Sequence, residues 1–238
     1  MKYKKVSIII PVFNEEKFIA KTIDKVIKAN ALNLKREIII VNDGSTDKTK
    51  NIISKVIGNK KNIVLINQIK NIGKGAALKR GFLKSTGDIV LIQDADLEYD
   101  PVDYPLLIRP FIENDVDVIY GSRFISNQPH RALFYWHYLA NIFLTTLSNI
   151  FTNLNLTDME TGFKVFKGNI IRQLAKNLQS KRFGFEPEIT AKISKIKNIK
   201  IYEVGISYFG RTYKEGKKIG LKDAIKTVWE IIKFNLFK

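Results

Sequence analysis

The feature that most constrains the fold is a regular alternation of short apolar runs with amphipathic segments in the first half of the chain. The apolar runs, which we expect to be strands, are Val6–Val12, Glu37–Val41, Ile63–Ile66, Ile89–Ile92 and Val116–Tyr120. The segments between them have helical spacing and cover Glu15–Ala29, Asp47–Ile57, Gly73–Leu83 and Tyr104–Glu113. Apolar strands that alternate with helices predict an α/β fold, with a mostly parallel sheet covered by helices on both faces.

Polar residues gather directly after four of the predicted strands. These strand ends are Pro11–Glu15, Asn42–Asp47, Asp94–Asp96 and Gly121–Arg123. In a parallel sheet the carboxyl ends of the strands meet at one edge, where ligands bind. The sequence therefore predicts one ligand site that combines several carboxylates with an arginine.

The acidic run after Ile92 predicts a metal site. Asp94, Asp96, Glu98 and Asp100 occupy every second position, although the chain carries 40 Lys and Arg against 23 Asp and Glu. Two carboxylates at a strand end suit Mg²⁺ or Mn²⁺, which bind one or two such groups together with substrate phosphates. An ion held this way can neutralise the charge of a departing nucleoside diphosphate.

Other chemistries fit the sequence less well. No phosphate-binding G-x-x-x-x-G-K-[ST] loop is present, and "GKGAALKRG" lacks the third glycine of a dinucleotide motif. The chain has no cysteine and only two histidines, His130 and His137, which leaves no Cys-His or Ser-His-Asp arrangement. The absence of cysteine fits a reducing cytoplasm, where we expect the protein to be.

The net charge of +17 permits nucleic acid, anionic lipid or a phosphorylated substrate as a partner. The lysines are scattered along the sequence, which favours a generally basic surface over a nucleic-acid groove, so we expect no nucleic-acid partner.

The second half of the chain lacks the regular alternation. We expect a helix near Ile170–Leu178 and a strand at Lys200–Val204, together with two amphipathic helices at 132–152 and 221–237. Each amphipathic helix is compatible with packing on the core or with lying on a membrane surface, and neither is expected to span a membrane. We predict a single domain over residues 1–238, because no linker separates the second half from the first.

Eight motifs, in order, resemble those of family 2 glycosyltransferases with the A-type nucleotide-sugar-binding fold. They are "IIIPVFNEE", "IIVNDGSTD", "NIGKGAALKRG", "QDADLEYDP", "GSRF", "TDMETGFKVF", "RFGFEPEIT" and "GRTYKEGKKIG". The resemblance covers nearly the whole chain and is most similar to the branch that includes dolichyl-phosphate mannose synthase and polyprenyl-phosphate glucosyltransferases. It implies an inverting, metal-dependent transfer of one sugar from a donor such as GDP-mannose or UDP-glucose to a polyprenyl or dolichyl phosphate.

The resemblance also implies that residues 1–125 form the nucleotide-sugar-binding half and residues 126–238 the acceptor-binding half. It further implies roles for residues on the donor side. Those expected to line the nucleotide pocket are Pro11, Phe13, Glu15, Asp43, Lys74, Asp94 and Ala95. Asp43 would accept a hydrogen bond from the base. Asp94, Asp96 and Glu98 would hold Mg²⁺ or Mn²⁺, and Asp96 is also a candidate catalytic residue.

On the acceptor side the required residues depend on the acceptor. A lipid phosphate is already anionic and needs cations to hold it, and the candidates are Arg123, Arg131, Arg211 and Lys217. We expect Arg123 and Arg211 to contribute most. A hydroxyl acceptor needs a base to remove its proton, and Glu186 is the candidate. Glu160 and Thr161 are also expected to line the site.

Two alternatives stay open at this point. The first is a family 2 enzyme that adds sugar to a glycan or another hydroxyl acceptor in cell-surface polysaccharide synthesis. The second is a non-catalytic basic module that binds anionic lipid or nucleic acid. The clustered carboxylates argue against the module, because they repel phosphate unless a metal intervenes. A peripheral contact with the cytoplasmic face of a membrane fits the amphipathic helices.

Overall fold

A seven-stranded sheet forms the centre of the molecule, with the strand order β3-β2-β1-β4-β6-β5-β7. The computed structural model describes residues 2–125, 130–132, 134–182, 184–212 and 221–237. The strands are β1 Lys5–Val12, β2 Lys35–Asn42, β3 Ile63–Asn67, β4 Ile89–Ile92, β5 Val118–Ser122, β6 Lys164–Lys167 and β7 Ile201–Gly205. The helices are α1 Ile19–Lys28, α2 Thr49–Ile57, α3 Lys74–Lys84, α4 Tyr104–Asn114, α5 Tyr135–Thr152, α6 Gly168–Lys176, α7 Phe185–Ser194 and α8 Leu221–Leu236, with a short 3₁₀ turn at Pro101–Asp103.

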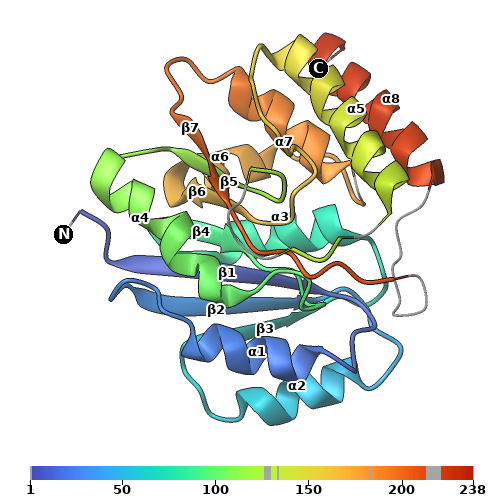
Figure 1. Cartoon of the computed structure of the whole chain (residues 1–238). Coiled ribbons are helices and arrows are strands. Elements are labelled where there is room, and N and C mark those ends of the chain that lie inside the picture. Colours follow the sequence, from blue (N-terminus) through green and yellow to red (C-terminus); the bar gives the residue numbers. More distant parts are fainter. Residues whose placement is uncertain (1, 126–129, 133, 183, 213–220, 238) are drawn as a thin grey trace.

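Helices cover both faces of the sheet, as Figure 1 shows. Alternate residues of each strand point to opposite faces, so Ile8 and Ile10 pack with α1, α2 and α4, whereas Ile9 packs with α3, α6 and α7. The predicted α/β fold with a mostly parallel sheet is therefore confirmed. Apolar side chains on both faces are what such a sheet requires, because neither face meets water.

Two elements were not predicted from the sequence. Strand β6 runs antiparallel between β4 and β5, which makes it the exception among the described strands. Only two of its four residues, Val165 and Phe166, are apolar, so it lacks the apolar run that marks the strands of the first half. Helix α7 begins at Phe185 and is buried without interruption from Phe185 to Ala191, so it has no polar stripe to reveal a helical period.

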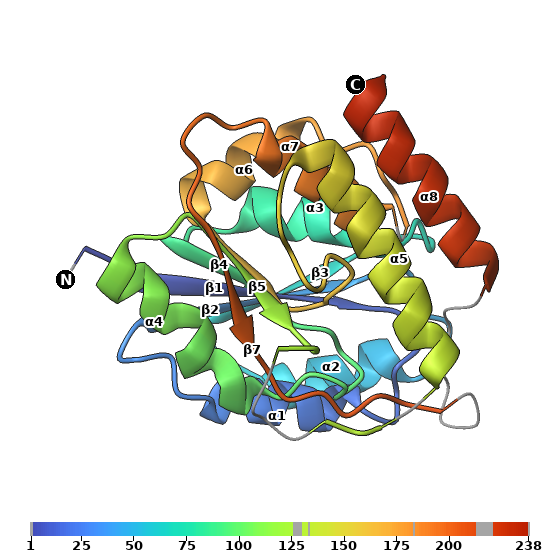
Figure 2. The same ribbon diagram turned by 45° about the horizontal axis from the view of Figure 1, so that its top comes forward.

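Helices α5 and α8 lie side by side at one end of the molecule (Figure 2). They pack through a separate apolar cluster that includes Leu144, Met159 and Ile231. Among the helices that the structure describes, none combines the length and the apolarity that a membrane span needs.

The polar stripe of α5 faces the protein and much of its apolar side faces outward. Thr145 accepts a hydrogen bond from the Met159 amide, and Asn149 bonds both backbone groups of Leu156. Trp136 and Ile150, in contrast, are 77% and 71% exposed. The outward aromatic residues of α5 thus have no structural role in the core.

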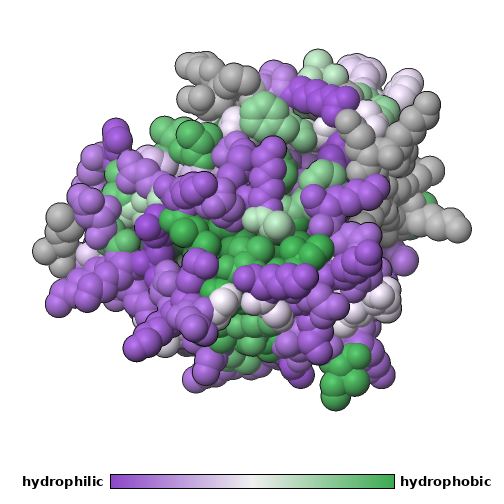
Figure 3. Space-filling view, turned by 90° about the horizontal axis from the view of Figure 1, so that it is seen from below, coloured by the Kyte–Doolittle hydropathy of each residue, from purple (hydrophilic) through white to green (hydrophobic). Residues whose placement is uncertain are grey.

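On the face seen from below, hydrophilic side chains predominate around a central apolar band (Figure 3).

Candidate active site

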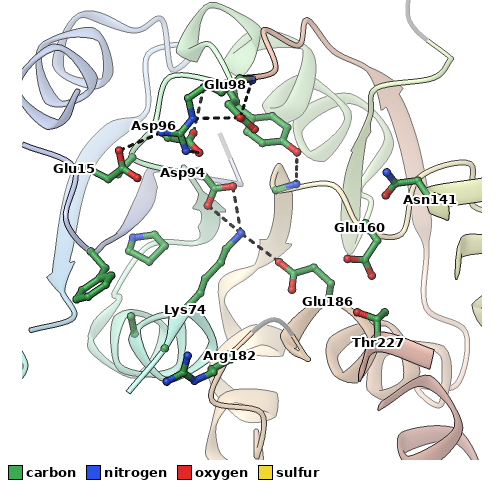
Figure 4. Close-up of a pocket in the computed structure, with 18 of the residues that line it drawn as sticks. Glu15, Lys74, Asp94, Asp96, Glu98, Asn141, Glu160, Arg182, Glu186 and Thr227 are labelled. Atoms are coloured by element: carbon green, nitrogen blue, oxygen red, sulfur yellow. Dashed lines mark hydrogen bonds and ion pairs between the residues drawn. The ribbon is translucent and has the colours of Figure 1, made fainter. Parts of the chain in front are cut away.

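A cavity of about 650 Å³ opens where β1, β2 and β4 end, and both halves of the chain line it. The first half contributes the strand ends and the start of α3. The second half contributes α5, α7, α8 and the segment after β7 (Figure 4). The lining residues that the sequence singled out are Pro11, Phe13, Glu15, Asp43, Lys74, Asp94, Ala95, Asp96, Glu98, Arg123, Glu160, Glu186 and Arg211. The structure brings these residues together, and their individual roles stay predictions.

The acidic turn after β4 holds Arg211 in a cluster of carboxylates. The Arg211 guanidinium lies 2.7 Å from Asp96 Oδ2, 3.3 Å from Glu98 Oε1 and 3.4 Å from Glu15 Oε2. Burial raises the pKa of Asp96 to about 7, with the Glu98 and Asp94 carboxylates adding to the effect and Arg211 opposing it. The cluster is therefore an environment in which a cation is strongly favoured.

Glu98 ties the segment after β7 to this turn. Its carboxylate accepts hydrogen bonds from the Tyr208 hydroxyl and the Arg211 amide, both at 2.9 Å. Its backbone carbonyl also accepts from the Phe209 amide at 2.9 Å. With both carboxylate oxygens engaged in this way, Glu98 would have to give up bonds in order to join a metal shell as the sequence predicted.

Lys74, the first residue of α3, connects two carboxylates across the cavity. Its Nζ lies 3.0 Å from Asp94 Oδ1 and 3.2 Å from Glu186 Oε1, as the dashed lines in Figure 4 show. Burial opposes the charge of Lys74, but the two carboxylates outweigh it and raise its pKa above the ordinary value. Lys74 therefore stays protonated and gives the acidic edge a fixed positive charge.

Asp43 lines the cavity, but its carboxylate is largely used by the segment that leads into α3. Oδ1 accepts from Gln68 Nε2 and the Ile72 amide, and Oδ2 accepts from Asn71 Nδ2 and the Gly73 amide. A carboxylate has about four lone-pair sites, so these bonds leave little capacity. The predicted bond to a nucleotide base would have to be shared with or exchanged for one of them.

Two glutamates present unpaired oxygens to the same space. Glu160 Oε1 and Glu186 Oε2 are buried and have no hydrogen-bond partner among the described residues. Thr161, which was also expected to line the site, is not among the described residues that line the cavity, and its buried hydroxyl lacks such a partner too. Figure 4 shows Glu160 and Glu186 side by side, between Asn141 and Thr227. Burial, reinforced by the Glu186 carboxylate, raises the pKa of Glu160 to about 8. A buried polar atom without a hydrogen-bond partner costs free energy, and a polar ligand bound in this corner would supply the missing partners.

Buried Lys164 holds the loop that carries Glu160. Its Nζ donates to the Met159 carbonyl at 2.8 Å and to the Thr161 carbonyl at 2.5 Å. Burial lowers the pKa of Lys164 to about 8, although the nearby glutamates oppose that change.

The predicted phosphate-binding cations differ in where they lie. Arg123 lines the cavity but forms a bidentate ion pair with buried Asp158. Its Nε lies 2.6 Å from Asp158 Oδ2 and its Nη2 lies 2.7 Å from Asp158 Oδ1. Arg131 is outside the cavity lining and donates to the Gly210 carbonyl at 3.2 Å. Lys217 falls outside the described residues. Arg182, which the sequence analysis missed, lines the cavity, is exposed and has no ion pair with a described residue. An isolated arginine in a loop carries no sequence signal that would have marked it.

The acidic turn fits a divalent cation that is shared with a ligand. Among the described residues, no three acidic or histidine side chains converge to form a metal shell. Asp94 and Asp96 nevertheless present hard oxygen atoms on one short turn. Mg²⁺ and Mn²⁺ need only one or two such ligands when substrate phosphates and water supply the rest.

An α/β sheet with helices on both faces, an acidic turn at a strand end and a cavity spanning both halves define a glycosyltransferase with the A-type fold. Sequence comparison gives the family directly. The chain belongs to glycosyl transferase family 2, whose model matches residues 7–175.

Curated relatives align along almost the whole chain. Dolichyl-phosphate beta-glucosyltransferase ALG5D of Trichomonas vaginalis is 29% identical and the alignment covers 98% of this chain and 73% of that protein. Dolichyl-phosphate beta-glucosyltransferase ALG5A of the same organism is 30% identical, with 97% and 73% covered. This chain is thus similar to these two enzymes along almost its whole length.

Solved structures share the fold at lower identity. Glucosyl-3-phosphoglycerate synthase from Mycobacterium tuberculosis, solved with Mn²⁺, uridine diphosphate and phosphoglyceric acid, gives a TM-score of 0.72 at 18% identity. The match covers 97% of this chain and 77% of that one. At this identity the likeness is one of fold.

Proposed function

We propose that this glycosyltransferase moves a single sugar from a nucleoside-diphosphate sugar to a polyprenyl phosphate, with inversion at the anomeric carbon. The observation that carries the proposal is the shared cavity. The acidic strand end and an apolar wall from α5 and α8, including Trp136, Leu144 and Ala224, face the same space. A charged donor and a lipid acceptor need these two surroundings side by side. The names of the curated relatives support the same acceptor class.

The exposed side of α5 supports a peripheral contact with a membrane, from which a lipid acceptor would come. Tyr135, Trp136 and Phe143 are 64%, 77% and 59% exposed. Aromatic residues of this kind are favoured at the boundary between water and lipid. We place this contact on the cytoplasmic face, where nucleotide sugars would reach the cavity.

On the donor side, Asp94 and Asp96 would hold Mg²⁺ or Mn²⁺ together with the diphosphate. When bound, the ion supplies positive charge that stabilises the leaving nucleoside diphosphate. Lys74 adds a fixed cation beside Asp94. The relatives with solved structures that bind Mn²⁺ or Mg²⁺ with uridine diphosphate support this choice of ions.

The unpaired oxygens of Glu160 and Glu186 are suited to the hydroxyl groups of the transferred sugar. A sugar hydroxyl can donate to the unpaired Glu186 oxygen and can either donate to or accept from the carboxyl group of Glu160, whose raised pKa favours the protonated form. Asn141 and Thr227, which line the same corner, add further polar contacts.

In the reaction an oxygen of the acceptor phosphate attacks the anomeric carbon from the side opposite the leaving group. The bond between that carbon and the diphosphate oxygen breaks, and the nucleoside diphosphate departs with the electron pair. The attacking phosphate is already anionic, so it needs no base and needs cations instead. Arg123 and Arg211 are held by carboxylates in this structure, which leaves Arg182, without an ion pair to any described residue, as a further candidate.

The test is transfer of radiolabelled sugar from UDP-glucose and from GDP-mannose in the presence of Mn²⁺. Polyprenyl phosphate in detergent is compared with the matching polyprenol, which offers a hydroxyl in place of the phosphate. We expect labelled lipid only with the phosphate, and a loss of roughly 100-fold or more for Asp96→Asn because transition-state charge is no longer stabilised. Transfer to polyprenol or to a soluble glycan instead would favour the hydroxyl alternative, for which Glu186 would be the base.

A further inference from the structure

A second cavity, of about 840 Å³, lies next to the first and has a different character. Residues 70–72, residues 179–182 with Gly184, and helix α8 line it. Asn71, Arg182 and Thr227 line both cavities, so the two are direct neighbours. We call the second one the basic groove. The proposed donor and acceptor chemistry uses only Arg182 and Thr227 of its lining, which it shares with the first cavity.

Positive charge dominates the basic groove. Among the described residues that line it, the cations are Lys70, Lys181, Arg182, Lys226 and Lys233, and the acid is Glu230. Glu230 is already paired with Lys233 at 3.0 Å. The other four cations form no ion pair with any described residue. Four uncompensated charges around one concave surface make it a site for an anion.

The groove is also firmly constructed. A Cβ added to Gly184 would lie 3.0 Å from both Glu230 Cγ and Ser180 Oγ, so α8 packs closely against this loop. Lys195 Nζ donates to the Phe234 carbonyl at 3.0 Å and ties α8 to α7. The buried hydroxyl of Ser180 has no hydrogen-bond partner. It lies among the lining residues and is available as a donor to a phosphate oxygen.

Exposed apolar side chains border the same cations. Ile225 and Trp229 line the groove and are 66% and 59% exposed, and Leu236 and Phe237 continue along the helix at 60% and 68%. Lysines beside exposed tryptophan and aliphatic residues match the boundary of an anionic bilayer, where both kinds of side chain are favoured. Nucleic acid would leave the aliphatic side chains in water.

We propose that the basic groove binds the phosphate headgroups of anionic phospholipids and so holds the neighbouring catalytic cavity against the membrane. The inference rests on the peripheral membrane contact of the proposed function, and it adds a specific lipid site to it. Arg182 lies at the boundary of the two cavities, whereas Lys70, Lys181 and Lys226 line the groove alone, so the headgroup site can be tested apart from the acceptor site.

The experiment measures binding of the full chain to vesicles that contain no polyprenyl phosphate, so its outcome is independent of sugar transfer. Vesicles of phosphatidylcholine alone are compared with vesicles that include phosphatidylglycerol. The test variant combines Lys70→Gln, Lys181→Gln and Lys226→Gln, all at exposed positions of the groove. The matched control combines Lys21→Gln, Lys50→Gln and Lys55→Gln on α1 and α2, which lie on the other side of the sheet (Figure 1).

We expect phosphatidylglycerol to strengthen binding of the wild type and of the control alike. The groove variant should lose about 100-fold in partitioning, since each basic residue near an anionic leaflet contributes roughly fivefold. Its transfer activity with detergent-solubilised acceptor should be unchanged, which separates this site from the catalytic one. Equal losses in both variants, or no effect of phosphatidylglycerol, would overturn the proposal. Groove-dependent binding to duplex DNA without a vesicle effect would also overturn it and assign the groove to nucleic acid.

Discussion

At the level of single residues, the active site depends on close approach as much as on charge. Gly73 has φ of +120°, donates its amide to Asp43 at 2.7 Å, and has no room for a Cβ beside the Lys181 carbonyl. Gly162, in contrast, does not have a positive φ, and only the lack of space for a Cβ requires glycine there. A Cβ there would lie 2.2 Å from Asp94 Oδ2 and 2.7 Å from Tyr99 Cε2. Only glycine lets β6 and its preceding loop approach the acidic turn this closely.

We therefore expect Gly162→Ala to weaken ligand binding more than folding. The added methyl group would push Asp94 away from Lys74 and lower the affinity for nucleoside diphosphate with Mn²⁺ by about 10- to 100-fold. The free energy of unfolding should fall by about 1–3 kcal/mol, as is typical of an overpacked site. Calorimetric titration and urea unfolding measure the two effects.

Gly81→Ala is the matched control, because its Cβ would meet Ile9 Cγ2 at 2.3 Å in the core. It should destabilise the fold without changing the affinity of the folded protein. Unchanged affinity in Gly162→Ala would contradict the steric argument.

At the level of elements, one carboxylate joins three segments of the sheet. Glu37 on β2 accepts from Lys5 Nζ at 2.8 Å and from the Ser7 hydroxyl, both on β1. It also accepts from the amide and hydroxyl of Thr86, in the loop before β4, at 2.8 Å and 2.7 Å. Burial opposes the charge, but these hydrogen bonds outweigh it and lower the pKa of Glu37 to about 2.

A lowered pKa in the folded state stabilises the protein above the unfolded pKa of about 4.3. We expect Glu37→Gln to cost about 1–2 kcal/mol at pH 7, allowing for solvent screening. The difference from wild type should shrink as the pH falls from about 4.5 to about 2, because the wild-type carboxylate becomes protonated. Urea unfolding across this pH range is the measurement.

Glu113→Gln, at an exposed position of α4, serves as the comparison and should change the free energy of unfolding by less than about 0.5 kcal/mol. A cost for Glu37→Gln that is independent of pH would show that the carboxylate's charge is not the cause.

At the level of the whole molecule, the catalytic cavity joins the two halves of the chain. Lys74 from the first half pairs with Glu186 from the second, and Asp96 pairs with Arg211. A ligand in this cavity therefore binds only when both halves are folded and in place. One domain over residues 1–238 stays a prediction, which thermal unfolding tests.

We expect one cooperative thermal transition. A matching nucleoside diphosphate should raise its midpoint temperature, Tm, only when Mn²⁺ is also present. A ligand at about 100 times its Kd adds about 2.7 kcal/mol. For a chain of this size that corresponds to a Tm increase of about 5–10 °C. A panel of UDP, GDP, ADP, CDP and dTDP, with Asp96→Ala as the control, identifies the donor base. Two separate transitions, with only one responding to ligand, would contradict the single domain.

Much of the fold could be predicted because its signals are local. The period of apolar residues identifies the strands and helices of the first half, and β4 was predicted with its observed bounds, Ile89–Ile92. The grouping of the donor-side residues followed from the rule that parallel strands end at one edge. Strand β6 escaped prediction because only two of its four residues, Val165 and Phe166, are apolar, and helix α7 because it is buried all round.

The sequence by itself determined the alternating α/β architecture and the position of the acidic turn, since both depend on residues close together in the chain. Tertiary structure alone decided which groups meet: Arg211 with Asp96, Arg123 with Asp158, and Glu160 beside Glu186. It also turned the polar stripe of α5 inward. Such pairings depend on which groups, distant in the sequence, are buried next to one another in the fold. The spacing of residues along the chain does not indicate this.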